Sequence, residues 1–181
     1  DDMVEDIRKN IFAILNYYNR LFVFKNMNAG QRLRLIYKLY PQSKFIWVKR
    51  NIQNTVKSLL KTRKQVNGNL KDWWSLMPPE YEDLKQLKPI EQVVKQVYYL
   101  EKQIYTDLNL FDKKNVKIIQ YKDFLDNPIS VISSLNLSKD TREDNKNISL
   151  IKPSSKDDPF NKYEEDIKYY ISKLDWDDYT S

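Results

Sequence analysis

A short, mostly apolar run at residues 44–48, KFIWV, ends in Lys49 and Arg50, and a helical pattern begins directly after it. Two similar runs occupy residues 21–26 and 116–121, and each follows a segment with helical spacing. Short apolar runs that alternate with helices are typical of parallel strands covered on both faces. The sequence therefore predicts an α/β fold in which a short parallel sheet is flanked by helices.

Apolar residues recur at helical spacing in the segments between and around these runs. Pro41 ends one such segment just before the run at 44–48, so residues 21–48 are expected to form a strand–helix–strand unit. Residues 67–89 and 138–162 are polar or proline-bearing and are expected to form loops. The expected helices cover residues 1–20, 30–40, 52–63 and 90–108, a segment that begins near Pro128, and residues 163–174.

The composition excludes several kinds of site. The chain has only two glycines, Gly30 and Gly68, so it cannot contain the glycine-rich loops of dinucleotide-binding or Walker A proteins. It has no cysteine and no histidine, which excludes thiol catalysis, thiolate zinc sites, imidazole bases and disulfides. We therefore expect no metal, and any chemistry must use Lys, Arg, Ser, Tyr and carboxylates. By its length of 181 residues, the chain is expected to form one domain, 1–181.

The net charge of +6 favours anionic partners such as phosphates, sulfates, nucleic acid or acidic peptides. The basic residues are interleaved with 25 acidic ones and match no nucleic-acid-binding module, so nucleic acid is the weaker alternative. The sequence has no apolar run of about 18 residues and no signal-peptide pattern at its start. We expect no membrane segment in the chain and a soluble protein, with the cytoplasm favoured.

Each predicted strand ends in a polar residue suited to a ligand. These residues are Lys25, Arg50 and Tyr121. Ligands of open parallel sheets bind outside the carboxyl ends of the strands, where these side chains could gather. The convergence predicts an anion site, although cations at strand ends are also common on ordinary surfaces.

The helix that follows Arg50 supports the same prediction. At 100° per residue, Asn51, Asn54 and Ser58 share one face, apart from the apolar stripe that includes Val56. A helix N-terminus attracts anions through its free N–H groups and its dipole. Arg50 adds a planar set of donors and Ser58 adds a hydroxyl, so a phosphate could lie between them. The alternative is the ordinary polar face of a surface helix.

The stretch FVFKNMNAGQRLRLIYKLYPQSKFIWVKRNIQNTVKS resembles the sulfotransferases that use 3′-phosphoadenosine 5′-phosphosulfate. In that family a strand ends in Lys, a helix and a proline follow, and a second strand leads to an Arg with a Ser eight positions later. Here the corresponding residues are Lys25, Pro41, Arg50 and Ser58, with the spacing intact.

Further motifs are most similar to the tyrosylprotein sulfotransferase branch. They are VKIIQYKDFLDNP at residues 116–128, SLIKPSSKDDPFNKY at 149–163 and the ending KLDWDDY. The likeness covers about residues 20–179, in order. It implies a sulfotransferase fold of the P-loop-like kind, of which this chain would form the C-terminal two thirds.

The resemblance implies a role for several residues. Arg50 and Ser58 would hold the 3′-phosphate of the nucleotide, and Tyr121 would contribute to the same site. Lys152 and Lys162 would belong to the segment that closes over the donor. Lys25 and Ser149 would have catalytic roles. Lys25 would stabilise the transferring sulfuryl group, because fixed cations stabilise charge that develops on its oxygens. Ser149 is the candidate for the family's catalytic serine.

The implied reaction moves a sulfuryl group from the nucleotide donor directly to a hydroxyl, leaving adenosine 3′,5′-bisphosphate, with no metal and no covalent intermediate. Protein tyrosine, a carbohydrate and a small-molecule hydroxyl are all candidate acceptors. Trp73 and Trp74 could line an acceptor cleft beside the donor or could instead cap the core under the long loop.

The sequence also departs from the family pattern. The first strand and the loop that binds the 5′-phosphosulfate have no counterpart, nor has the catalytic carboxylate of the helix after that loop. Asn51 replaces the usual acid after the 3′-phosphate Arg, and the family's second Arg would fall at Thr62, with Arg63 one position away. We therefore expect an incomplete site and very low activity of this chain alone. A non-catalytic nucleotide-binding protein is the alternative.

Overall fold

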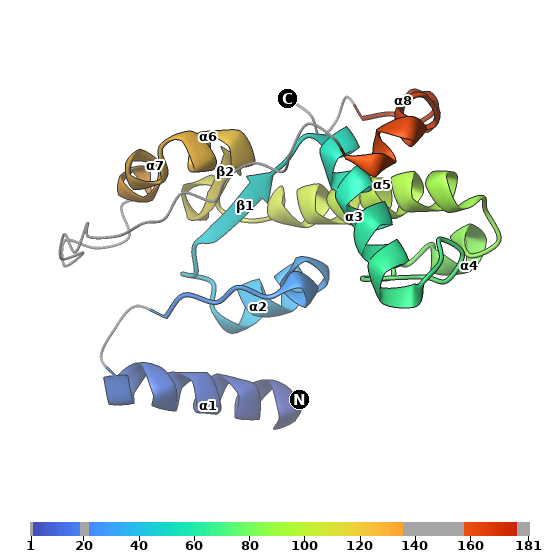
Figure 1. The fold of residues 1–181 in the computed structure, drawn as a ribbon. Coiled ribbons are helices and arrows are strands. Elements are labelled where there is room, and N and C mark those ends of the chain that lie inside the picture. Colours follow the sequence, from blue (N-terminus) through green and yellow to red (C-terminus); the bar gives the residue numbers. More distant parts are fainter. Residues whose placement is uncertain (1, 19–21, 136–157, 177–181) are drawn as a thin grey trace.

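The computed structural model of the chain describes residues 2–18, 22–135 and 158–176 (Figure 1). In chain order the elements are α1 (Asp2–Tyr18), η1 (Met27–Arg32), α2 (Leu33–Leu39), β1 (Phe45–Lys49), α3 (Ile52–Asn67), α4 (Tyr81–Leu84), α5 (Pro89–Leu108), η2 (Lys113–Asn115), β2 (Val116–Gln120), α6 (Tyr121–Asp126), α7 (Pro128–Ser134), η3 (Pro159–Tyr163) and α8 (Glu164–Ile171), where η marks a 3-10 helix.

Strands β1 and β2 pair in parallel, with a register that runs from Phe45 opposite Val116 to Lys49 opposite Gln120. Parallel strands need a long crossover connection, which α3, α4 and α5 supply here. Figure 1 shows α5 running behind β1 and α3. The predicted α/β fold with a short parallel sheet and flanking helices is therefore confirmed, and the strands predicted at 44–48 and 116–121 form within one residue of those bounds.

The strand predicted at residues 21–26 does not form in the part of it that the structure describes. Residues 22–26 lie outside any strand, and Phe22, Val23 and Phe24 are 46%, 74% and 61% exposed. The described sheet has two strands, β1 and β2. A strand needs a partner for its backbone groups, and the apolar character of three residues does not supply one.

Instead of entering a sheet, this segment leads into η1, which packs against α5. The side chain of Asn26 accepts a hydrogen bond from the backbone N of Asn28 at 2.8 Å and starts the 3-10 turn. Gly30 lies so close to α5 that a Cβ there would approach the Ile104 side chain to 3.0 Å. The helix expected over 30–40 is therefore η1 followed by α2, and η1 begins three residues earlier at Met27.

Two apolar clusters form the core of the described structure. The first joins α3, α5 and α8, and the second joins α2, β1 and the end of α5. Each follows the helical spacing of the sequence, because that spacing places apolar side chains on one face of each helix. The fully buried apolar residues of the first cluster are Val56, Leu60, Val93, Val94 and Ile167.

Helix α3 is well defined at both ends. The side chain of Asn51 caps its start by accepting a hydrogen bond from the backbone N of Asn54 at 3.1 Å. Gly68 follows its last turn at φ 72°, a left-handed conformation that glycine adopts without steric strain. Both ends matter for function, since α3 carries Ser58 and begins directly after Arg50.

Across the described residues, no helix is both long enough and apolar enough to cross a membrane.

Candidate functional site

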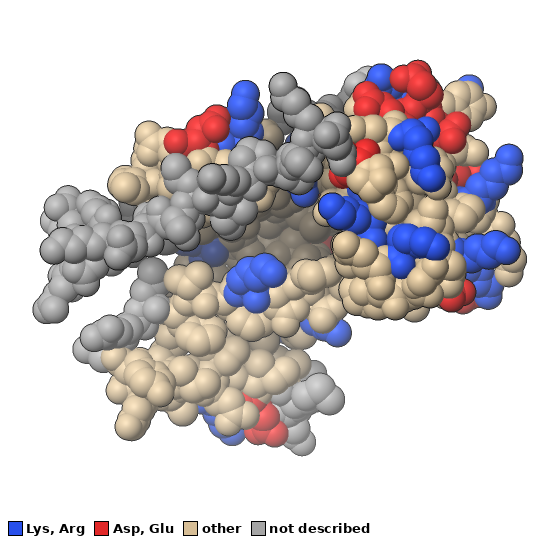
Figure 2. Space-filling model, viewed as in Figure 1, with Lys and Arg blue, Asp and Glu red and all other residues tan. Residues whose placement is uncertain are grey.

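A cavity of about 510 Å³ lies at the carboxyl ends of the two strands. Its wall comes from the end of β1, the outer face of α3, the long loop before α4, the middle of α5 and the start of α6. Figure 2 shows a hollow on this face of the molecule, with Lys and Arg side chains around it. The polar residues of the wall are Arg50, Thr55, Ser58, Thr62, Ser75, Glu101 and Tyr121.

Lys49 and Arg50 are neighbours in the chain but lie in different environments. Lys49 is buried, and its Nζ lies 5.0 Å from the centre of the Trp47 ring. Arg50 is exposed and lines the cavity, with its guanidinium carbon 5.3 Å from the centre of the Tyr121 ring. Successive side chains of a strand point to opposite faces, so the end of β1 sends one cation inward and the next outward.

The register of the sheet explains why Arg50 meets Tyr121. Lys49 pairs with Gln120, so the next residue on each strand emerges at the same level. Tyr121 is also the first residue of α6. Of the three residues predicted to gather at one sheet edge, Arg50 and Tyr121 therefore lie together, whereas Lys25 does not line the cavity.

Helix α3 contributes a row of hydroxyls to the cavity. Thr55, Ser58 and Thr62 all line it, as expected for residues spaced three and four apart on one helix face. The hydroxyls of Thr55 and Thr62 donate to backbone carbonyls of Asn51 and Ser58, at 3.1 and 2.9 Å. Ser58 itself is exposed.

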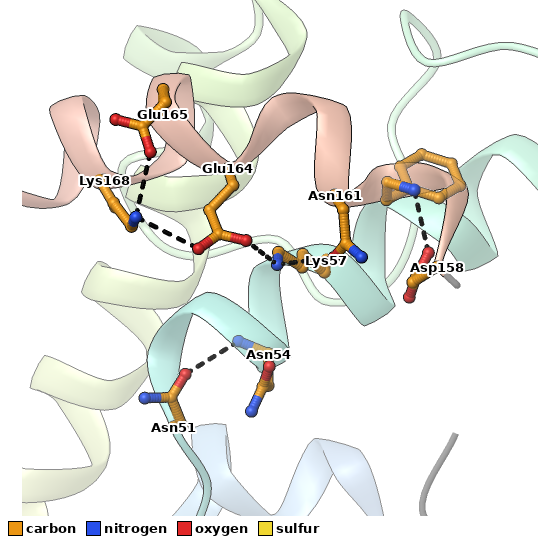
Figure 3. Close-up of polar contacts among 9 residues, drawn as sticks. Asn51, Asn54, Lys57, Asp158, Asn161, Glu164, Glu165 and Lys168 are labelled. Atoms are coloured by element: carbon orange, nitrogen blue, oxygen red, sulfur yellow. Dashed lines mark hydrogen bonds and ion pairs between the residues drawn. The ribbon is translucent and has the colours of Figure 1, made fainter. Parts of the chain in front are cut away.

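Asn51 and Asn54, which were expected to share the anion-binding face with Ser58, have a different role. The side-chain oxygen of Asn51 is engaged by the backbone N of Asn54, so it caps α3 (Figure 3). Neither asparagine lines the cavity in the described structure. Of the three residues, Ser58 alone belongs to the site.

Glu101 on α5 also lines the cavity, and the sequence reasoning missed it. Burial raises the pKa of this carboxyl to about 7, while the positive charge of Lys49 acts in the opposite direction. A signal was present in the sequence, since position 101 falls on the apolar stripe that contains Val97 and Ile104. A carboxylate on such a stripe is unusual and marks a candidate functional group.

The position expected for the family's second arginine is occupied by Thr62, which lines the cavity, while Arg63 points into the core. Arg63 is fully buried and donates to the side-chain oxygens of Gln92 at 2.5 Å and Gln96 at 3.3 Å. Burial lowers its pKa to about 10. Arg63 therefore supports the structure and does not take the place of that arginine in the site.

Two predicted lysines do not line the cavity. Lys25 is exposed in the segment before η1, two residues ahead of Met27, whose side chain does belong to the wall. Lys162 is exposed on η3, with its Nζ 5.0 Å from the centre of the Tyr163 ring. The other two predicted residues, Ser149 and Lys152, lie outside the described residues.

The segment that carries Lys162 is nevertheless tied to the helix of the site. Lys57, one residue before Ser58, donates to the side chains of Asn161 at 2.9 Å and Glu164 at 2.8 Å (Figure 3). Hydrogen bonds from Lys57 and Lys168 lower the pKa of Glu164. These contacts hold η3 and α8 against α3.

Within the described ranges, no group of three or more His, Cys, Asp or Glu residues could hold a metal ion. The ligand-binding features that the structure does bring together are a guanidinium, a row of hydroxyls and an aromatic ring at the carboxyl ends of parallel strands. Together they define an α/β protein with a candidate anion site in the place typical of open parallel sheets.

The family model described as sulfotransferase family matches residues 2–136, so the chain belongs to the sulfotransferase family. The matched range contains Arg50, Ser58 and Tyr121, and it ends before Lys162. It also includes α1, which precedes the range of the resemblance seen in the sequence. Neither the curated proteins nor the solved structures gave a match.

Proposed function

We propose that the cavity binds the 3′-phosphate of 3′-phosphoadenosine 5′-phosphosulfate, and that the protein transfers a sulfuryl group from this donor to a hydroxyl. One observation carries the proposal. Arg50 after β1, Ser58 on α3 and Tyr121 at the start of α6 line the same cavity. A hydroxyl of protein tyrosine is the acceptor that the likeness to the tyrosylprotein branch favours.

The residues of the cavity suit a phosphate. A guanidinium offers several N–H donors in one plane, which matches the oxygens of a phosphate, and the Ser58 hydroxyl adds another donor. The guanidinium lies over the Tyr121 ring, which restricts where the guanidinium can point. Less conformational freedom is then lost when the phosphate binds.

The transfer step needs charge stabilisation beyond this phosphate site. The acceptor oxygen forms a bond to sulfur while the bond from sulfur to the donor phosphate oxygen breaks. Adenosine 3′,5′-bisphosphate leaves with the electron pair of that bond, and the proton of the acceptor hydroxyl passes to solvent. Lys25 is proposed to face the oxygens of the sulfuryl group, where a fixed cation lowers the barrier. Lys152 and Lys162 are proposed to cover the donor, and Ser149 is proposed as the catalytic serine.

Calorimetric titration of adenosine 3′,5′-bisphosphate into the chain tests the binding half of the proposal. We expect saturable binding that Arg50→Ala weakens by about 10- to 100-fold, because a charge-assisted contact to phosphate is lost. Ser58→Ala should weaken it by roughly 3- to 10-fold. Lys122→Ala is the matched control. It removes a cation next to Tyr121 in the chain, and Lys122 does not line the cavity.

Equal affinity of the unmodified chain and Arg50→Ala would contradict the proposed site. A different pattern would indicate non-specific binding to polyanions such as nucleic acid. In that pattern affinity falls steeply with salt, Lys122→Ala and Arg50→Ala weaken binding equally, and Ser58→Ala has no effect.

A non-catalytic nucleotide-binding protein is the second candidate function. The observation that favours it is that Lys25 and Lys162 do not line the cavity in the described structure. The two functions differ in one measurement, which is donor-dependent sulfation of a hydroxyl acceptor by the chain. Nucleotide binding that depends on Arg50, without any sulfation, would support the non-catalytic function.

A further inference from the structure

The two adjacent tryptophans of the long loop have different surroundings. Trp73 is packed among other side chains, with its ring centre 4.8 Å from that of Tyr81 and 5.4 Å from the Arg63 guanidinium carbon. Trp74 instead lines the cavity, together with Ser75. Trp73 therefore has the core-capping role, and Trp74 belongs to the wall of the site.

The backbone at this point is strained. Ser75 has a φ of 74°, and it is the described residue other than glycine that takes a positive φ. A residue with a Cβ in this conformation costs about 1 to 3 kcal/mol and persists only where the surrounding contacts enforce it. Such strain is common at ligand sites, so the contacts that enforce it here are informative.

Each backbone carbonyl of residues 74–76 accepts a hydrogen bond from a side chain. The amide nitrogen of Gln96 donates to the carbonyl of Trp74 at 2.9 Å and to that of Leu76 at 2.7 Å. The indole nitrogen of Trp73 donates to the carbonyl of Ser75 at 3.2 Å. These three hydrogen bonds fix the backbone on both sides of the strained residue.

Gln96 is in turn held from within the core. It is fully buried, and its side-chain oxygen accepts from Arg63, which is also fully buried. Burying a guanidinium and an amide is unfavourable unless their partners are in place. A loop that only covered apolar surface would not require this arrangement, whereas a loop that must present Trp74 in one position would.

The cavity wall combines polar and apolar residues. Arg50 and Ser58 supply polar groups, while Met27, Leu59 and Trp74 supply apolar and aromatic surface. A volume of about 510 Å³ is also far larger than a single phosphate group needs. The ligand should therefore carry an apolar, planar part next to its anionic part.

We infer that Trp74 binds a planar aromatic ring in this cavity, and that Gln96 and Arg63 position it through the loop backbone. The inference rests on the proposed function and adds a residue and a ligand class to it. The ring could belong to the base of the nucleotide or to an aromatic acceptor, since an indole face stacks on either. Trp74 touches the ligand, and Gln96 is a positioning residue.

Three variants test the role of Trp74 by calorimetry with three probes. The probes are adenosine 3′,5′-bisphosphate, which has a ring and phosphates, ribose 5-phosphate, which lacks the ring, and p-cresol, which is the side chain of tyrosine. Trp74→Ala should weaken a ring-bearing probe by about 5- to 100-fold, the range expected for loss of one stacked ring. Trp74→Phe should retain most of the affinity. Trp47→Phe, at a tryptophan of β1 that does not line the cavity, is the control and should leave all three affinities unchanged.

The pattern among the probes identifies the source of the ring. Weaker binding of the bisphosphate in Trp74→Ala, with ribose phosphate unchanged, assigns Trp74 to the nucleotide base. Weaker binding of p-cresol alone assigns it to the acceptor. Unchanged affinity for both ring-bearing probes overturns the inference, and so does an equal loss for ribose phosphate, which would indicate general damage to the cavity.

Gln96→Met tests the positioning role, because it removes the donor to both carbonyls and preserves the side-chain length. We expect Gln96→Met to weaken binding of the same ring-bearing probe that Trp74→Ala weakens, with the affinity for ribose 5-phosphate retained. An equal loss of affinity for that probe and for ribose 5-phosphate would mean that Gln96 serves the fold alone. Because Trp74 is only partly buried, its own variants still decide the main inference if Gln96→Met does not fold.

The outcomes also separate this inference from the proposed function. One result would overturn this inference and leave the proposed function standing: nucleotide binding depends on Arg50, and Trp74→Ala changes neither nucleotide affinity nor p-cresol affinity. Binding of p-cresol that depends on Trp74, with no nucleotide binding, would overturn the proposed function alone. If none of the probes binds to the unmodified chain, both are wrong.

Discussion

The guanidinium carbon of Arg50 lies 5.3 Å from the centre of the Tyr121 ring, and this contact joins the carboxyl ends of β1 and β2. It depends on the parallel register of the two strands, in which Lys49 pairs with Gln120. A slip of the register by one residue would separate the two side chains and send one of them to the other face of the sheet. The candidate site is thus a consequence of strand pairing.

Replacing Tyr121 should show how much this contact contributes to binding. We expect Tyr121→Leu to weaken adenosine 3′,5′-bisphosphate by roughly 3- to 10-fold, because Arg50 loses the ring that restricts it. Tyr121→Phe keeps the ring face and should bind within about 2-fold of the unmodified chain. Calorimetry on both variants is the measurement. A larger loss in Tyr121→Phe would show that the phenol hydroxyl, and not the ring, makes the contact with the ligand.

The carboxyl of Glu101 should make stability depend on pH. Burial raises its folded-state pKa to about 7, above the ordinary value of 4.5, so the folded chain holds this proton more tightly than the unfolded chain. The resulting stabilisation is fully present below about pH 4.5 and is lost as pH rises through about 7. Glu101→Gln, which stays neutral, should therefore be more stable at about pH 8 by roughly 1 to 3 kcal/mol.

Thermal unfolding at several pH values measures this effect. The advantage of Glu101→Gln should disappear below about pH 5, where the carboxyl is protonated in both states. Glu165→Gln, on the exposed side of α8, is the control and should show no such trend. Lower stability of Glu101→Gln at high pH would mean that attraction to Lys49 outweighs the cost of burying the charge.

Glu101 should also couple nucleotide binding to protons. A phosphate that enters the cavity is repelled by the charged carboxylate and not by its neutral form, so binding favours protonation. Affinity for adenosine 3′,5′-bisphosphate should therefore fall as pH rises through about 7, and less so in Glu101→Gln. Calorimetry in buffers of different ionisation enthalpy should detect proton uptake. The same pH dependence in both proteins would exclude Glu101 as its source.

Arg63 should be far more important for stability than its exposed neighbour Lys64. Arg63→Ala leaves the buried side-chain oxygens of Gln92 and Gln96 without their donor and opens a cavity, so we expect a loss of about 3 to 5 kcal/mol in unfolding free energy. Lys64→Ala should change it by about 0.5 kcal/mol or less. Chemical denaturation compares the two, and a similar small change in both would show that the buried network relaxes after the substitution.

Asn51 should contribute to stability and not to ligand affinity. Asn51→Ala removes the cap of α3 and should cost about 1 kcal/mol of unfolding free energy. Its effect on nucleotide affinity should stay within about 2-fold, because its side-chain oxygen is engaged by the backbone. Asn54→Ala keeps the backbone N–H of that bond and is the control. A strong loss of affinity in Asn51→Ala alone would place Asn51 in the site.

Much of the fold could be predicted from local patterns. The spacing of apolar residues located α3 and α5, because a helix buries one face and the period of 3.6 records which residues lie on it. The same reasoning failed for residues 22–26, whose apolar side chains are exposed. Whether an apolar run becomes a strand depends on a pairing partner elsewhere in the chain, and three residues do not reveal that partner.

By itself, the sequence predicted that Arg50 and Tyr121 would lie at one sheet edge with Ser58 on the helix after Arg50, because the ends of strands and the turns of a helix have fixed geometry. It also predicted Lys25 at that edge, and Lys25 does not line the cavity. Only the tertiary structure decided which of two neighbouring residues faces the cavity, as with Trp73 and Trp74, and that Glu101 completes its wall. The physical reason is that periodicity shows which side chains share a face, whereas the packing of one element on another decides what that face meets.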